Sequence, residues 1–167
     1  MIPYERAVEL MHQNVEPLGT EEIETHRCAD RVLAREVVAK LSSPPFDKAA
    51  MDGFAVREED VSSPPVELEE IGTSFAGEPS EVQVGTGQCA RITTGAPVPD
   101  GADMVVMKEH VERTEDGRVR ILKLSGHNIC PEGEDIREGK AVLQKNEAMT
   151  RMKVGVAASA GYDRLEV

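Results

Sequence analysis

Short apolar runs separated by turn residues dominate the middle of the chain. Between residues 46 and 133 these runs alternate with clusters of Gly, Pro, Asp and Ser, and they comprise residues 66–71, 82–84, 89–93, 104–107 and 119–124. Short, regularly spaced strands with turn signals between them are typical of an all-β unit. The Asp-Gly pair at 116–117 has the composition of a tight hairpin turn. We therefore predict a small all-β domain, barrel-like or Greek-key, over residues 45–135.

The N-terminal segment shows a different pattern. Pro3 suits a first helical turn and the apolar side chains within residues 7–11 supply one face, so we predict a helix that ends at Pro17. Residues 20–28 alternate roughly between polar and apolar positions, which predicts a strand. Residues 30–38 predict one turn of helix followed by two apolar pairs. Helix and strand are therefore mixed in this part of the chain.

The C-terminal segment returns to this mixed pattern. Residues 139–143 predict a strand. Thr150 is a suitable N-cap for a helix that runs to Ala160, with Gly161 as its C-terminal stop. Residues 165–167 begin a further strand. A chain with mixed elements at both ends and a β segment between them predicts a discontinuous domain.

We predict an α+β, mostly β fold with two domains. The Ser-Ser-Pro-Pro sequence at residues 42–45 breaks the chain between the two patterns. Residues 1–44 plus 136–167 are expected to form the discontinuous mixed α/β domain, and residues 45–135 the inserted all-β domain. A length of 167 residues is sufficient for two small domains.

The net charge of the chain makes some classes of binding partner unfavourable. Lys and Arg number 19 against 31 Asp and Glu, which gives a net charge of −12. Because so acidic a surface repels phosphate backbones, we do not expect nucleic-acid binding. An anionic small molecule would need a local positive pocket, a bridging Mg²⁺, or basic residues from another domain.

The spacing of the cysteines and the length of the apolar runs indicate the cellular compartment. The three cysteines, Cys28, Cys89 and Cys130, are far apart and show neither a Cys-x-x-Cys pair nor zinc-ligand spacing. Their pattern favours a reducing, cytoplasmic environment. No signal peptide is indicated, and the longest apolar run, residues 154–160, is too short to cross a bilayer. We therefore expect a soluble cytoplasmic protein without membrane contact.

Asp52 precedes Gly53 in the sequence PFDKAAMDGFAV, residues 45–56. Asp-Gly is among the commonest hairpin turns, so a structural role is one interpretation. The alternative is a functional carboxylate at a position where glycine lets a ligand approach the backbone. Such a carboxylate can hold a divalent cation or orient an oxyanion through water, and Mg²⁺ often combines one or two carboxylates with substrate phosphates. Asp52 is thus both a catalytic and a metal-ligand candidate.

Two further stretches carry candidate chemistry. In ITTGAPVPDGAD, residues 92–103, the segment Thr93-Thr94-Gly95 is either a strand running into a Pro-rich turn or a hydroxyl beside exposed backbone N–H groups that bind an anion. The third stretch, Gly133-Glu134-Asp135-Ile136, is by its residues alone a turn whose carboxylates cap the next element.

These three stretches resemble one family, the molybdopterin molybdotransferases of molybdenum-cofactor synthesis, which are relatives of the gephyrin E domain. The resemblance implies that Asp52 and Asp135 lie near the active-site cleft and that Thr94, with Thr93 and Gly95, contacts the pterin substrate or the oxyanion. The family more often has Asn-Ser where this chain has Lys48-Ala49, and Tyr where it has Phe54. Many relatives carry arginines, which would suit a phosphate, where this chain has Cys-Pro-Glu at residues 130–132. The resemblance therefore implies no phosphate-binding residues at these positions.

The resemblance implies an enzyme that inserts molybdate, or tungstate, into adenylylated molybdopterin with Mg²⁺ and releases AMP. It covers only the N-terminal part of the family. The pterin-binding C-terminal α/β domain has no counterpart in these 167 residues, and in the family the cleft forms between the subunits of a homodimer. We therefore expect the chain alone to be inactive and to need that domain in cis or in trans. The alternative is a non-catalytic scaffold or dimerisation module of the gephyrin type.

Overall fold

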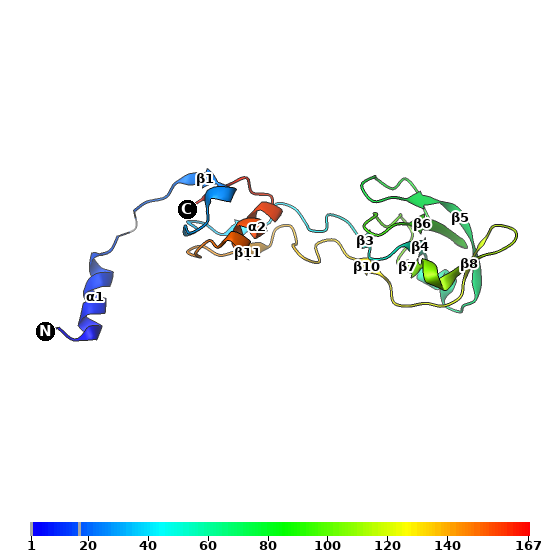
Figure 1. Cartoon of the computed structure of the whole chain (residues 1–167), viewed down its shortest axis with the longest axis horizontal. Coiled ribbons are helices and arrows are strands. Elements are labelled where there is room, and N and C mark those ends of the chain that lie inside the picture. Colours follow the sequence, from blue (N-terminus) through cyan, green and yellow to red (C-terminus); the bar gives the residue numbers. More distant parts are fainter. Residues whose placement is uncertain (1, 17) are drawn as a thin grey trace.

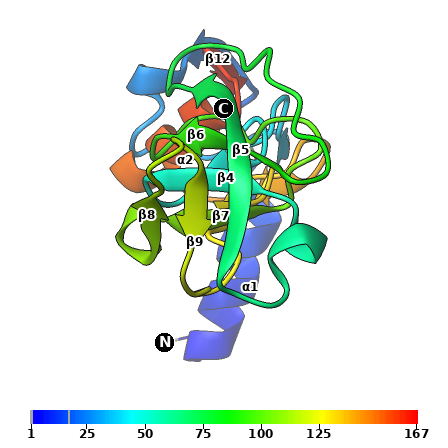
Figure 2. The same cartoon turned by 90° about the vertical axis from the view of Figure 1, so that its right-hand side faces the viewer.

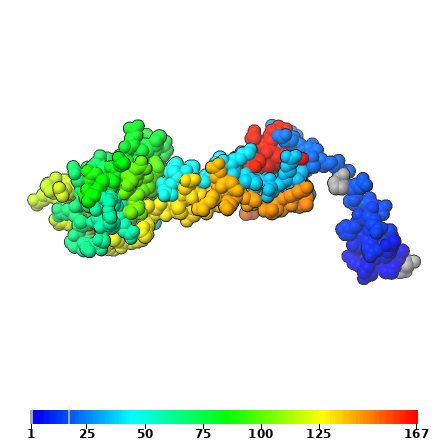
Figure 3. Space-filling model, turned by 180° about the vertical axis from the view of Figure 1, so that it is seen from behind, coloured from blue at the N-terminus to red at the C-terminus, as the bar shows by residue number. Residues whose placement is uncertain are grey.

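The computed structural model describes residues 2–16 and 18–167 and shows an elongated molecule with two lobes (Figures 1 and 3). Helix α1, Tyr4–Asn14, stands apart from both lobes at the N-terminal end. None of its residues is buried. The predicted helix is confirmed, and its expected end at Pro17 lies outside the described residues. In the described part of the chain, no helix has both the length and the apolar composition needed to cross a membrane.

The lobe next to α1 combines one helix with two small antiparallel sheets. It contains β1 (Glu22–Glu24), the 3₁₀ turn η1 (Thr25–Arg27), β2 (Val37–Val38), β11 (Ala141–Leu143), α2 (Arg151–Ser159) and β12 (Arg164–Glu166). Strand β1 pairs with β12, and β2 pairs with β11. The core of this lobe comes from both ends of the chain, namely Cys28, Leu33, Val37, Ala39, Leu143, Met149, Ala157, Ala160, Leu165 and Val167.

The elements predicted at the C-terminal end of the chain are confirmed, since β11, α2 and β12 lie where strand, helix and strand are expected. Thr150 caps α2 by accepting a hydrogen bond from the backbone N–H of Lys153 at 3.3 Å, and Gly161 follows the helix with φ +90°. The strand predicted over residues 20–28 is only three residues long, because the chain continues into η1. The predicted helical turn at 30–38 is wrong, since Asp30 sits in a turn with φ +66°.

The other lobe is built on one six-stranded sheet of order β7-β4-β6-β5-β9-β8 (Figure 2). Its strands and 3₁₀ turns are β4 (Gly53–Val56), η2 (Glu58–Val61), β5 (Val66–Ser74), β6 (Gln88–Ile92), β7 (Met104–Met107), η3 (Lys108–His110), β8 (Val111–Arg113) and β9 (Val119–Ile121). All neighbours are antiparallel except β5 and β6, which are parallel. A two-stranded pair, β3 (Lys48–Ala49) with β10 (Ile129–Cys130), lies beside it.

The sheet-rich α+β class is confirmed, with a sheet that curls as half a barrel. The hairpin at 116–117 joins β8 to β9 as predicted, and Gly117 has φ +85°. The strand predicted over 82–84 is wrong, because only a single bridge joins Gln83 to Asp100 there. Edge strands β7 and β8 are not paired with each other. The small barrel-like or Greek-key domain therefore stays a prediction.

Two chain segments run side by side between the lobes (Figure 1). Ser43 and Ile136 exchange backbone hydrogen bonds of 2.7 and 3.1 Å, and the Gly133 N–H donates to the Pro44 carbonyl at 2.9 Å. The lobe with the six-stranded sheet has two apolar clusters, one around Phe54, Val56 and Val106 and one around Ile92 and Val105. The buried residues of both clusters come from residues 49–121, and the partly buried Leu124 and Ile129 pack against them. The predicted boundaries, 1–44 plus 136–167 around 45–135, stay a prediction.

Candidate functional site

The site is set by the register of strand β4 between its two neighbours. Gly53, the first residue of β4, pairs with Ile92 at the end of β6 and with Met107 at the end of β7. The residue before Gly53 is therefore flanked by the residues that follow both neighbouring strands. Asp52 is that residue, and its backbone carbonyl accepts a hydrogen bond from the Lys108 N–H at 3.1 Å.

Gly53 is required by packing. A Cβ at this position would lie 1.9 Å from the Val106 carbonyl oxygen, a distance that no side chain can adopt. The Asp-Gly pair is not a hairpin turn, because β4 pairs with β6 and β7 and not with the preceding strand β3. The glycine thus lets β7 approach closely, and the close approach brings Lys108 next to Asp52.

Asp52 is held by Thr94 on one oxygen and by Lys108 on the other. The backbone N–H and the hydroxyl of Thr94 both donate to Oδ1 of Asp52 at 2.9 Å, and the Lys108 ammonium donates to Oδ2 at 3.1 Å. Together, the Thr94 hydrogen bonds and the Lys108 charge lower the pKa of Asp52 from 3.8 to about 2. The group is therefore an ionised carboxylate at neutral pH, although its side chain is 47% exposed.

The other two residues of the Thr-Thr-Gly segment shape the turn. The Thr93 hydroxyl accepts a hydrogen bond from the Ala76 N–H at 3.2 Å. Gly95 has φ +83°, and its N–H donates to the Ala49 carbonyl at 2.8 Å. A side chain at that φ would be strained, so Gly95 allows the turn that places the Thr94 N–H against Asp52.

Asp135 is not brought to this cluster. It lies on the segment between the lobes, its side chain is exposed, and its backbone N–H donates to the Ser43 carbonyl at 3.0 Å. No hydrogen bond or ion pair joins its side chain to Asp52 or Thr94. Its place in a catalytic site stays a prediction.

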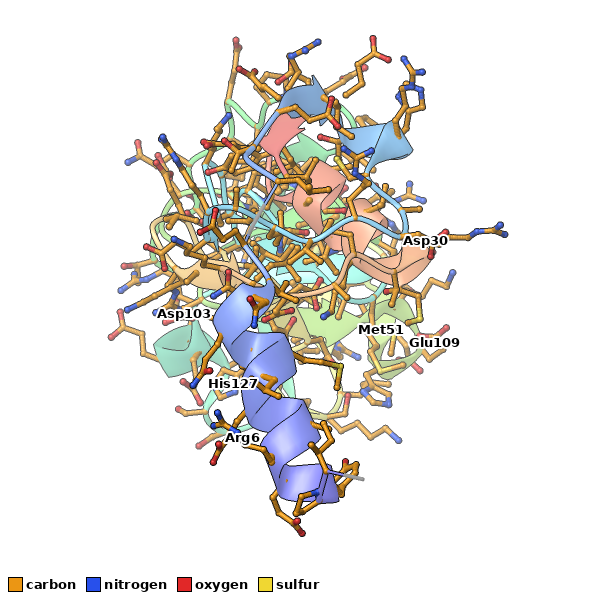
Figure 4. The ribbon with its side chains drawn as sticks, turned by 90° about the vertical axis from the view of Figure 1, so that its left-hand side faces the viewer. Arg6, Asp30, Met51, Asp103, Glu109 and His127 are labelled. Atoms are coloured by element: carbon orange, nitrogen blue, oxygen red, sulfur yellow. The ribbon has the colours of Figure 1, made fainter. Side chains whose placement is uncertain are left out.

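A cavity of about 290 Å³ opens beside Asp52, and Thr93 also lines it. Sequence reasoning missed its three cations, which are Arg91 on β6, Lys108 at the start of η3 and Arg113 at the end of β8. A signal for Lys108 was present, because it directly follows the apolar run 104–107. Figure 4 labels Met51 and Glu109, the sequence neighbours of Asp52 and Lys108, and both lie on the same side of the molecule.

The residues around Asp52 do not match the ligand set of a metal ion. Among residues 2–16 and 18–167, no three His, Cys, Asp or Glu side chains gather as a metal site. Mg²⁺ is bound by oxygen ligands, and the ammonium of Lys108 already neutralises the Asp52 carboxylate. These residues do not fit a magnesium ion held by this chain alone.

Comparison with known proteins gives the family. The profile of the family described as MoeA N-terminal region (domain I and II) matches residues 2–161. The chain belongs to this family. The predicted resemblance to the molybdotransferases is thereby confirmed for the N-terminal region of MoeA, with both the Asp52 and the Thr94 segments inside the match.

Three relatives of this MoeA region are each named molybdopterin molybdenumtransferase. The protein of Haemophilus influenzae is 35% identical over 147 residues, that of Synechococcus elongatus 36% over 175 residues, and that of Bacillus subtilis 34% over 175 residues. These alignments cover 87%, 100% and 99% of this chain but only 36%, 43% and 41% of the relatives. The chain therefore spans less than half the length of these relatives.

Comparison with solved structures agrees with the family given by the sequence relatives. A crystal structure of the molybdopterin biosynthesis MoeA protein from Pyrococcus horikoshii superposes on all of this chain, with a TM-score of 0.87 and 32% sequence identity. The superposition covers 44% of that chain. A second structure of the same protein gives a TM-score of 0.88 over 46% of its length.

Proposed function

We propose that this chain supplies part of the site at which molybdenum is inserted into molybdopterin during molybdenum-cofactor synthesis. One observation carries the proposal: the two stretches that most closely resemble the molybdotransferases meet through the hydrogen bonds from Thr94 to Asp52. They meet at the rim of a cavity whose lining is rich in cations. Three relatives named for this activity support the same assignment.

The charges around the cavity suit the proposed substrates. Molybdate is an oxyanion and the dithiolene of molybdopterin is anionic, whereas the protein carries a net charge of −12. The lining contains Arg91, Lys108 and Arg113. Lys108 is paired with Asp52 and Arg113 with Glu70, so Arg91 supplies the unpaired positive charge that an anion requires in such a protein. In this proposal proximity and charge neutralisation accelerate the reaction, and no covalent nucleophile is needed.

The hydrogen bonds suggest a role for each group. The Thr94 hydroxyl directs its proton to Asp52, so this proton is not free for an oxyanion. The Lys108 ammonium has three donors and uses one on Asp52, which leaves two for a substrate oxygen. We therefore assign oxyanion binding to Lys108. Asp52 positions that ammonium, and Thr94 keeps Asp52 ionised and oriented.

We further propose that the site is completed by a segment outside these 167 residues. Relatives continue well beyond the matched region, since the chain covers 36–43% of them. A C-terminal α/β domain, in cis or in trans and within a homodimer, would supply the pterin-binding part. Adenylylated molybdopterin as the form consumed, magnesium as the assisting ion and molybdate rather than tungstate stay predictions of the resemblance.

The test is molybdenum insertion with and without an added C-terminal domain. The 167-residue chain is incubated with molybdate and adenylylated molybdopterin, either alone or with the C-terminal domain of the Pyrococcus horikoshii protein. We expect insertion only in the second mixture, and a strong reduction with Asp52→Asn. The matched control is the relative's own N-terminal region with the same C-terminal domain. If the control turns over and this chain does not, the proposal is wrong.

A scaffold or dimerisation role of the gephyrin type is the second candidate. One observation favours it: α1 buries none of its residues, and Tyr4 and Met11 on it are 79% and 60% exposed. Uncovered apolar side chains on one helix are typical of a surface that binds another polypeptide. A scaffold tolerates Asp52→Asn without loss of function, whereas the proposed enzyme does not, so the same variant separates the two candidates.

A further inference from the structure

Arg91 occupies a position on the core face of its strand. Side chains alternate along a strand, so Arg91 shares a face of β6 with Cys89, which is completely buried in the apolar cluster around Phe54. The cross-strand partner of Arg91 on β4 is Phe54 itself, which is 7% exposed. An aliphatic residue would extend the cluster here, but the chain places an arginine at its edge. Its stem can cover the ring while the guanidinium reaches solvent.

Arg91 lines the cavity and is not paired with a carboxylate of the described residues. Among the cations of the lining, Lys108 is paired with Asp52 and Arg113 with Glu70. Arg91 forms no ion pair and no side-chain hydrogen bond with any described residue. Its full set of donors is available to a ligand.

The charges around the cavity are balanced, in contrast to those of the protein as a whole. Arg91, Lys108 and Arg113 are matched by Asp52 and Glu112 in the lining and by Glu70, which pairs with Arg113. In a protein with a net charge of −12, a neutral cluster that contains the unpaired Arg91 repels an anion less than the rest of the surface does. The volume of about 290 Å³ lies at the lower limit of the roughly 300–1,000 Å³ of pockets that enclose drug-sized ligands. The cavity therefore suits a small anion better than a whole pterin.

We propose that Arg91 anchors a subsite for a tetrahedral oxyanion, with the Lys108 ammonium as second donor. The planar guanidinium offers two parallel N–H groups, a geometry that matches two oxygens of one tetrahedral anion. The identity of the anion rests on the proposed function: it is either free molybdate or the phosphate of the pterin substrate. The existence of the subsite rests on the cavity and its charges alone.

The experiment is isothermal titration of the protein with sodium molybdate and, separately, with inorganic phosphate. Arg91→Gln removes the charge, and Arg91→Lys keeps it while losing the two parallel donors. The control is Arg118→Gln, which removes an equal charge from the exposed hairpin, where Arg118 faces Asp116 and lies outside the cavity lining. A thermal melt of each variant checks folding.

We expect saturable binding of at least one anion at low ionic strength, weakened about tenfold or more by Arg91→Gln because charge-assisted hydrogen bonds are lost. Arg91→Lys should fall between wild type and Arg91→Gln, and Arg118→Gln should match wild type. Absence of binding by the wild type overturns the subsite. So does equal affinity in Arg91→Gln and Arg118→Gln.

Competition between the two anions identifies the source. Molybdate binding that phosphate does not displace indicates the free oxyanion, and the converse indicates the substrate's phosphate. The subsite and the proposed function can fail separately. Equal binding by wild type and Arg91→Gln, together with normal molybdenum insertion, removes the subsite and leaves the function. Arg91-dependent binding with no insertion in the complemented mixture retains the subsite and removes the proposed function.

Discussion

Thr94 donates two hydrogen bonds to a single oxygen of Asp52, one from its hydroxyl and one from its backbone N–H, each 2.9 Å long. The two residues are 42 positions apart in the sequence. Both sit directly before a glycine, and each glycine has a separate structural reason: close packing against Val106 at Gly53, and a positive φ at Gly95. The pair is therefore fixed by the backbone on both sides, which is the arrangement expected of a preorganised polar site.

Under the proposed function, removing either partner should impair molybdenum insertion by this chain when a C-terminal domain is added. Asp52→Asn takes away the charge that holds the Lys108 ammonium, and Thr94→Ala takes away one of the two hydrogen bonds that Thr94 donates to Asp52. We expect a loss of about tenfold or more in turnover, in the range of single preorganised donors. Thr94→Ser keeps the hydroxyl and should retain most of the activity. Normal turnover in both damaging variants would leave the site assignment without support.

The titration of Asp52 offers a measurement independent of activity. Its pKa is lowered from 3.8 to about 2 by the Thr94 hydrogen bonds and by Lys108. Because the native pKa lies below the ordinary value, ionised Asp52 stabilises the fold above about pH 4, and this contribution is lost as the pH falls towards 2. Carboxyl ¹³C shifts should show a midpoint near 2 in the wild type. Lys108→Gln should raise the midpoint towards 3.8 without reaching it, since both Thr94 donors remain. An unchanged midpoint in that variant would show that Lys108 does not pair with Asp52 in solution.

Two glycine-to-alanine variants should change stability in opposite directions. Gly53→Ala places a methyl group 1.9 Å from the Val106 carbonyl oxygen, so β4 and β7 must separate. We expect a loss of about 2–3 kcal/mol in the free energy of unfolding, as for other overpacked sites. Gly155→Ala lies in α2 with nothing within 4 Å of the new Cβ, and it should add about 0.5–1 kcal/mol. Urea denaturation measures both, and a neutral Gly53→Ala would contradict the β4–β7 register.

The three cysteines should differ in reactivity. Cys28 and Cys89 are buried, and burial raises the pKa of both thiols, that of Cys89 to about 12. Cys130 is only half-buried. Because the thiolate is the reactive form, iodoacetamide at pH 8 should label Cys130 first, and peptide mass spectrometry can follow each site. In denaturant all three should react at similar rates. Early labelling of Cys89 in the native protein would be inconsistent with its place in the core.

Much of the local structure could be predicted from short-range patterns. The strands at 89–93, 104–107 and 119–124, the hairpin at 116–117 and the Thr150 cap each depend on residues close in sequence. Strand β4 was missed because all four of its residues are buried, so the alternation that marks a half-exposed strand is absent. At 82–84 the opposite error occurred, since Val84 is buried but belongs to a loop with one bridge.

The sequence by itself determined the family, the sheet-rich character and the two residues, Asp52 and Thr94, that the structure joins. Only the tertiary structure decided which other residues lie beside these two. It added Lys108 and Arg91 and left Asp135 on the segment between the lobes. The physical reason is register: β4 lies between β6 and β7, and the residues flanking its first position come from distant parts of the chain. Local patterns encode strands and turns, but which strand ends meet follows from long-range pairing.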